Sequence, residues 1–132
     1  MSLEITHNPS AAGCRSGCRY AVLLHTGIPE GSHYDLLVEP KPGEGDLMTW
    51  RLPAWPLTAA DEVRRLRDHR RVYLTYEGPI RGDRGVVHRV DEGLAEVDVS
   101  ARVVTLSLGA RGRLRLELLN DDRWWCAPES AG

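Results

Sequence analysis

Short segments in which apolar and polar residues alternate recur along most of this chain, and turn-forming residues separate them. Alternation of this kind is typical of β-strands, because successive side chains of a strand point to opposite faces of the sheet. The predicted strands are residues 20–25, 33–39, 47–52, 71–76, 85–90, 94–99, 102–108, 113–119 and 123–127. So many short strands would expose several edges in an open sheet. The pattern therefore predicts a mainly β protein, a small closed or nearly closed antiparallel β-barrel.

The side chains expected inside the barrel are the apolar members of one face of each strand. They are Val22, Leu24, Leu36, Val38, Trp50, Val72, Val104, Leu106, Leu108, Leu114, Leu116 and Leu118.

One segment departs from the strand pattern. Thr58 offers a hydroxyl at a helix N-cap position, and Asp61 adds an acidic side chain in the first turn. Both features favour helix initiation and suit the helix dipole. Val63 and Leu66 would share the inner face of such a helix, so we expect one short α-helix ending near Asp68.

Length and composition indicate one small globular domain. The 132 residues have room for a single core, and 42% of them are hydrophobic and 27% charged. We expect a flexible N-terminal arm at residues 1–18, one domain at residues 19–128 and a tail at residues 129–132. The sequence has neither a leader-like segment nor an apolar run long enough for a membrane span, so we expect a cytoplasmic protein without a membrane partner.

The stretch at residues 32–39 carries the strongest chemical signal. Its period of two places His33, Asp35 and Leu37 on one strand face, and turn residues at 27–31 connect it to the strand that ends at His25. If these strands pair as a hairpin, two imidazoles and one carboxylate converge, which is a donor set for a divalent transition metal. The alternative is a polar surface, or a histidine held by a carboxylate. Cys14 and Cys18 could be offered as a zinc site, but without a second pair we interpret them as incidental thiols.

A dense arginine cluster occupies residues 64–71. Such a cluster is typical of a solvated helix face, but it is also what contact with a phosphate backbone requires. Arg64, Arg67 and Arg71 are the candidate substrate-binding residues of this cluster.

Three motifs occur in a fixed order, LLH…SHYDLLVE, then GDLMTWRLP, then RDHRRVYLTYEGPIRGDRG. This order resembles the 3'-phosphoesterase domain found at the N-terminus of bacterial DNA ligase D and as short stand-alone proteins. The resemblance covers residues 20–127 and implies a small β-barrel. It also implies a metal, manganese with zinc as the alternative, held by His25, His33 and Asp35. It further places His69 and Tyr73 beside the scissile phosphate.

The function that this resemblance implies is removal of a 3'-phosphate or 3'-ribonucleotide from DNA or RNA ends, with an end-joining ligase or polymerase as a possible partner. Two positions depart from the family pattern. Leu37 stands where the family has a phosphate-binding arginine, and Ala54 and Trp55 follow Pro53 where a basic residue is usual. An aliphatic side chain cannot replace the bidentate grip of a guanidinium on phosphate. We therefore expect weakened activity, and the alternative is a non-catalytic nucleic-acid- or protein-binding module on the same barrel.

Overall fold

The computed structural model of this protein describes residues 14–129. Its elements are strands and two short 3-10 helical turns, η1 and η2. In chain order they are β1 (Cys14–Thr26), β2 (His33–Val38), β3 (Leu47–Leu52), β4 (Asp61–His69), η1 (Arg71–Leu74), β5 (Gly78–Pro79), β6 (Val86–Val99), β7 (Val103–Ser107), η2 (Gly109–Arg111), β8 (Arg113–Asn120) and β9 (Arg123–Glu129).

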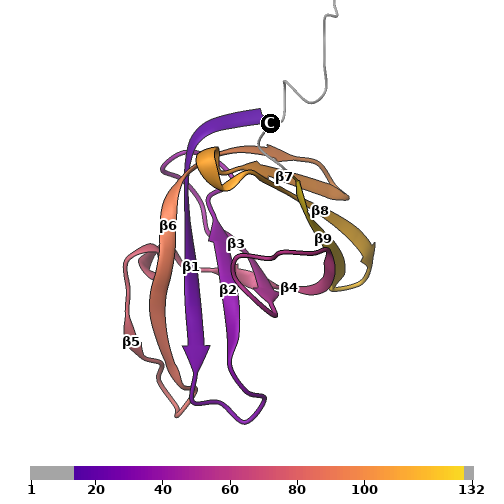
Figure 1. Cartoon of the computed structure of the whole chain (residues 1–132). Coiled ribbons are helices and arrows are strands. Elements are labelled where there is room, and N and C mark those ends of the chain that lie inside the picture. Colours follow the sequence, from indigo (N-terminus) through magenta and orange to yellow (C-terminus); the bar gives the residue numbers. More distant parts are fainter. Residues whose placement is uncertain (1–13, 130–132) are drawn as a thin grey trace, which may run out of the picture.

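The strands close into an antiparallel barrel, as the sequence predicts. Eight of them follow the order β1-β2-β3-β4-β9-β8-β7-β6, and β6 pairs again with β1 to complete the circle. The long strands β1 and β6 run side by side in Figure 1, and the short β5 pairs with β6 at one side of the barrel. Closure leaves none of these eight strands with a free edge.

The barrel interior is filled by one apolar cluster. Trp50 is fully buried in it, and its ring meets that of Trp124 edge to face at 5.5 Å between centroids. Most of the predicted interior is confirmed, namely Val22, Leu36, Val38, Trp50, Val104, Leu106, Leu108, Leu114 and Leu116, with Leu118 packed against them. Two predictions are wrong, since Val72 is 50% exposed and Leu24 is only half-buried at one end of the barrel.

A second apolar cluster lies on the outer wall. Alternate residues of β1 and β2, including Leu23 and Leu37, point away from the barrel interior and pack with Leu74 of η1 and Val87 of β6. Tyr73, Tyr76 and Ile80 pack against this cluster. The segment at residues 70–85 is thereby held against the wall, next to the ends of β1 and β2 that carry the histidines.

The predicted helix at residues 58–68 is wrong, because Asp61–His69 forms strand β4. This strand pairs with β3 on one side and β9 on the other, so it supplies the connection that closes the barrel. Val63 points into the interior, and the Arg65 guanidinium stacks over the Trp50 ring at 4.8 Å from its centroid. Pairing on both sides outweighs the local helix signals, since a helix here would leave β3 and β9 with open edges.

Three other boundaries differ from the predictions. The segment 71–76 begins with the turn η1 and is not a strand, while the predicted strands at 85–90 and 94–99 form the single strand β6. Strand β1 starts at Cys14, so residues 14–18 extend the barrel wall, and the rest of the expected arm lies outside the described residues. Within residues 14–129 no helix is long and apolar enough to cross a membrane.

Candidate metal centre

The histidines and aspartate singled out in the sequence converge on the outer wall, at one end of the β1–β2 hairpin. His25 and His33 are paired across the two strands, with ring centroids 4.9 Å apart. The Asp35 carboxylate lies between them, 3.2 Å from His33 Nε2 and 3.8 Å from His25 Nδ1. All donor atoms of this set, here called the triad, lie within 4.8 Å of one another. The predicted convergence is confirmed.

Two atoms of the triad are buried without a hydrogen-bond partner. They are His33 Nε2 and Asp35 Oδ1, and their residues are only 6% and 4% exposed. Buried polar atoms are normally satisfied, because leaving one unpaired costs roughly 1–3 kcal/mol. A cation that accepts a lone pair from each of these two atoms would remove this cost. Two imidazole nitrogens and a carboxylate oxygen suit zinc, manganese or another divalent transition metal, so the triad fits such an ion without selecting one.

The tautomer of His25 also suits metal binding. His25 Nε2 donates a hydrogen bond to the carbonyl oxygen of Arg84 at 2.6 Å, which places the ring proton on Nε2. Nδ1, the atom nearest Asp35, then carries the lone pair. Donation of the second ring nitrogen to a carbonyl is the usual way in which proteins orient a ligating histidine.

Gly85 makes this hydrogen bond possible. Its φ of +84° is unfavourable for other residues, and a Cβ there would lie 2.2 Å from the Thr26 carbonyl oxygen and 3.0 Å from His25 Nε2. The loop can therefore approach His25 only because residue 85 has no side chain. The signal in the sequence is the pair of glycines at residues 82 and 85 in the loop after β5.

His69 and Tyr73 reach the same site from other elements. A pocket of about 300 Å³, here called the triad pocket, is lined by His25 and Asp35 together with His69 at the end of β4 and Tyr73 of η1. The rings of His69 and Tyr73 meet edge to face at 5.6 Å. His69 Nδ1 lies 2.9 Å from the Arg67 carbonyl oxygen and donates to it, which leaves Nε2 to accept or release a proton. The structure thus brings the two candidate catalytic residues to the candidate metal ligands.

The candidate substrate-binding arginines separate into two groups. Arg67 lines the triad pocket. Arg64 is paired with Asp122 at 3.3 Å and lies outside that pocket. Arg71 donates to the buried Glu39 carboxylate at 2.5 Å and to the Gly45 carbonyl oxygen at 3.1 Å, so it fastens η1 to the barrel wall.

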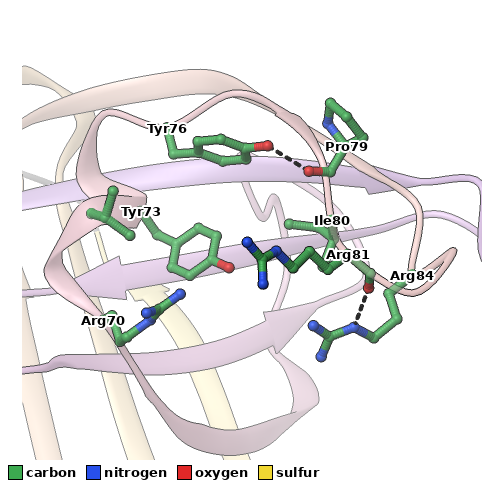
Figure 2. Close-up of a pocket in the computed structure, with 8 residues that line it drawn as sticks. Arg70, Tyr73, Tyr76, Pro79, Ile80, Arg81 and Arg84 are labelled. Carbon is green, nitrogen blue, oxygen red and sulfur yellow. Dashed lines mark hydrogen bonds between the residues drawn. The ribbon is translucent and has the colours of Figure 1, made fainter.

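Sequence reasoning missed further arginines at the site. A groove of about 230 Å³, here called the arginine groove, shares Tyr73 and Ile80 with the triad pocket. In Figure 2 the side chains of Arg70 and Arg81 flank the Tyr73 ring. Arg84 lies beyond Arg81, and its Nε donates to the Arg81 carbonyl oxygen. The available signal was the pair of arginines in the glycine-rich loop at residues 81–85.

Leu37 lies on the strand face of His33 and Asp35, as predicted, but it does not face a substrate. Its side chain is fully buried in the outer apolar cluster with Leu23 and Leu74. An arginine at this position would point under η1 and not into the triad pocket.

The cysteines take no part in the site. Cys14, Cys18 and Cys126 are free thiols. Cys18 and Cys126 belong to the barrel interior. Burial, followed by the nearby Glu39 carboxylate, raises the pKa of Cys18, and burial raises the pKa of Cys126 to about 12. Metal binding requires a thiolate, so these thiols are poor ligands.

The fold and the site define a small β-barrel protein with a candidate divalent-metal centre on its outer wall. No protein-family model matches the chain, and no curated protein matches it.

Proposed function

We propose that this protein is a metal-dependent phosphoesterase that acts on the 3' ends of DNA or RNA, removing a 3'-phosphate or 3'-ribonucleotide, as the ligase D phosphoesterase domains that it resembles do. One observation carries the proposal. His69 and Tyr73, which are distant in sequence from the hairpin, line the same pocket as His25 and Asp35. A metal-binding set alone would support storage or structural roles, but an added imidazole and phenol suit phosphoryl chemistry.

The chain supplies most of the groups that such a reaction needs. A divalent ion held by His25, His33 and Asp35 would polarise a phosphoryl oxygen. His69 presents one nitrogen to exchange a proton with the departing oxygen, because its other nitrogen is held by the Arg67 carbonyl. Tyr73 can donate a hydrogen bond to a phosphoryl oxygen.

The surroundings of the triad favour a polyanionic substrate. Arg67, Arg70 and Arg84 line the triad pocket, and Arg81 joins Arg70 and Arg84 in the adjacent arginine groove. Arg67, Arg70 and Arg81 have no ion pair with any residue of the segment 14–129, so their charge is available to phosphates. A nucleic-acid strand has a phosphate at every nucleotide, and its binding would release counterions and depend steeply on salt. Manganese is the metal proposed, with zinc as the alternative.

The test is incubation of the full chain and manganese with end-labelled primer-templates that carry a 3'-phosphate, a 3'-ribonucleotide or a 3'-hydroxyl. We expect shortening or dephosphorylation of the first two and no change of the third. His69→Ala should slow the reaction by about 100- to 10,000-fold, the usual contribution of general acid–base catalysis. His88→Ala, a change at an exposed histidine outside the triad pocket and the arginine groove, is the matched control. Equal rates in wild type and His69→Ala would contradict the proposal.

The second candidate is a non-catalytic nucleic-acid- or protein-binding module, including one that serves an end-joining ligase or polymerase. The burial of Leu37 favours it, because no guanidinium reaches the triad from that position. Salt-dependent binding of the three primer-templates without any turnover, unchanged by His69→Ala, would support this candidate instead.

A further inference from the structure

Arg51 occupies the strand next to the triad. On the outer wall it lies in register between Asp35 of β2 and Arg64 of β4. Directly opposed residues of an antiparallel pair share a face, with Cβ atoms about 4.5–5.5 Å apart. Its neighbours in sequence, Trp50 and Leu52, point into the barrel, so the Arg51 side chain projects on the face that carries His33 and Asp35.

Arg51 is partly buried and has no partner for its charge among residues 14–129. Its Nε is buried without a hydrogen bond, and no ion pair is formed by its guanidinium. The neighbouring arginines differ. Arg64 is paired with Asp122 at 3.3 Å, and Arg123 makes a two-bond contact with Glu62 at 2.8 and 2.9 Å. A buried N–H group without an acceptor is destabilising unless a ligand supplies one.

The space beside Arg51 adjoins the triad. A pocket of about 390 Å³, here called the β3 pocket, is lined by Arg51 and His33, together with Arg64, Arg123 and Glu62. The triad therefore forms the boundary between this pocket and the triad pocket, with His33 on one side and His25 and Asp35 on the other. Because carboxylates pair the Arg64 and Arg123 charges, the β3 pocket retains the positive charge of Arg51, which suits an anion.

We propose that Arg51 binds the phosphate group of the substrate at the triad, and that it supplies from β3 the guanidinium that residue 37 lacks. A guanidinium can contact two oxygens of one phosphate, and these contacts would satisfy the buried Nε. This inference rests on the proposed function, because it assigns a phosphate ligand to that same site.

The test uses the full-length, manganese-loaded protein and thymidine 3'-monophosphate as the probe, with binding measured by titration calorimetry. Arg51→Met should weaken binding of the probe by about 10- to 100-fold, the loss expected for charge-assisted hydrogen bonds. Manganese affinity should stay within about twofold, since Arg51 is not a metal ligand. The melting temperature of Arg51→Met should equal or exceed that of wild type, because the change removes an unsatisfied buried group. Arg113→Met is the matched control and should leave affinity for the probe unchanged, because Arg113 is an exposed arginine paired with Glu129 at 3.6 Å and lies outside the β3 pocket.

Equal probe affinity in wild type and Arg51→Met would overturn the inference, as would the absence of probe binding in wild type. Loss of manganese from Arg51→Met would also overturn it, by showing that Arg51 acts through the metal site. The proposed function is judged separately on the primer-templates. Arg51-dependent probe binding without turnover supports this inference and contradicts hydrolysis. Turnover of the primer-templates, together with probe binding that does not depend on Arg51, supports hydrolysis and contradicts this inference.

Discussion

Leu37 illustrates how one residue can organise a site without touching the substrate. It is fully buried between the barrel wall and η1, in the same cluster as Leu23 and Leu74. Since η1 carries Tyr73, this contact helps to hold the phenol beside the triad. The strand period predicted its face from sequence, but it could not reveal that a later segment covers that face.

Leu37→Arg tests this view of position 37. We expect the change to lower the free energy of unfolding by about 3–5 kcal/mol, because it buries an uncompensated charge. Urea denaturation monitored by tryptophan fluorescence measures the effect, and Leu37→Met, which keeps the volume, should cost less than about 1.5 kcal/mol. A Leu37→Arg protein as stable as wild type, with tighter binding of thymidine 3'-monophosphate, would show that residue 37 does reach the phosphate.

Glu39 and Arg71 form a second fastening between the wall and η1. Burial alone would raise the pKa of Glu39, but hydrogen bonds from the Arg19 amide, Arg71 and the Gly43 amide together lower it. A carboxyl group with a lowered pKa in the folded state stabilises the fold above its unfolded value near 4.5. That contribution is lost as the pH falls through the folded pKa.

Glu39→Gln should therefore reduce stability at pH 7 and flatten the loss of stability below about pH 4.5. Arg71→Ala should destabilise the fold by about 1–3 kcal/mol, since it removes the ion-pair partner of Glu39 but leaves the hydrogen bonds from the Arg19 and Gly43 amides. Arg67→Ala, in the triad pocket, should leave stability within about 0.5 kcal/mol. Denaturation curves recorded from pH 3 to pH 7 provide the comparison. If Arg67→Ala and Arg71→Ala were equally stable, Arg71 would have no special structural role.

At the scale of elements, the local hairpin was predictable and the longer connections were not. His25, His33 and Asp35 meet through a short turn, so strand period and turn residues were sufficient to predict their convergence. His69 was predicted just after a helix and Tyr73 on a strand, but they lie on β4 and η1. The resemblance selected these residues by their order, and barrel closure determined the elements that carry them. Arg51 could have been found from the same period, because Trp50 was predicted to point inward.

The loop at residues 80–85 is the element whose approach orients His25. Gly85→Ala should weaken manganese binding by about 10- to 100-fold, the usual effect of disturbing a partner of a metal ligand. The added Cβ would collide with the Thr26 carbonyl oxygen and displace the Arg84 carbonyl from His25. Gly82→Ala is the control, because φ there is also positive, at +75°, but no backbone atom is close. Equal affinity in both variants would mean that loop approach does not orient the histidine.

At the scale of the whole molecule, the packed barrel positions the residues of the candidate site on its outer wall. The interior is packed with apolar side chains such as Trp50 and Leu106. The outer wall instead receives the segment at residues 70–85, which brings a phenol and several arginines to the triad. Alternation and turn spacing predicted the closed barrel, because closure is the general solution for many short strands. The position of this segment on the outer wall depends on packing between residues that are far apart in sequence. Alternation and turn spacing are local signals and do not specify such packing.

The central claim is that the triad is a metal centre, and calorimetric titration of the full chain with manganese tests it most directly. We expect one manganese ion per chain in wild type and no measurable binding in His33→Ala, because two remaining ligands rarely hold a labile divalent ion. Cys14→Ser should bind like wild type, since the Cys14 thiol lies outside the triad. Equal manganese affinity in wild type and His33→Ala would contradict the account.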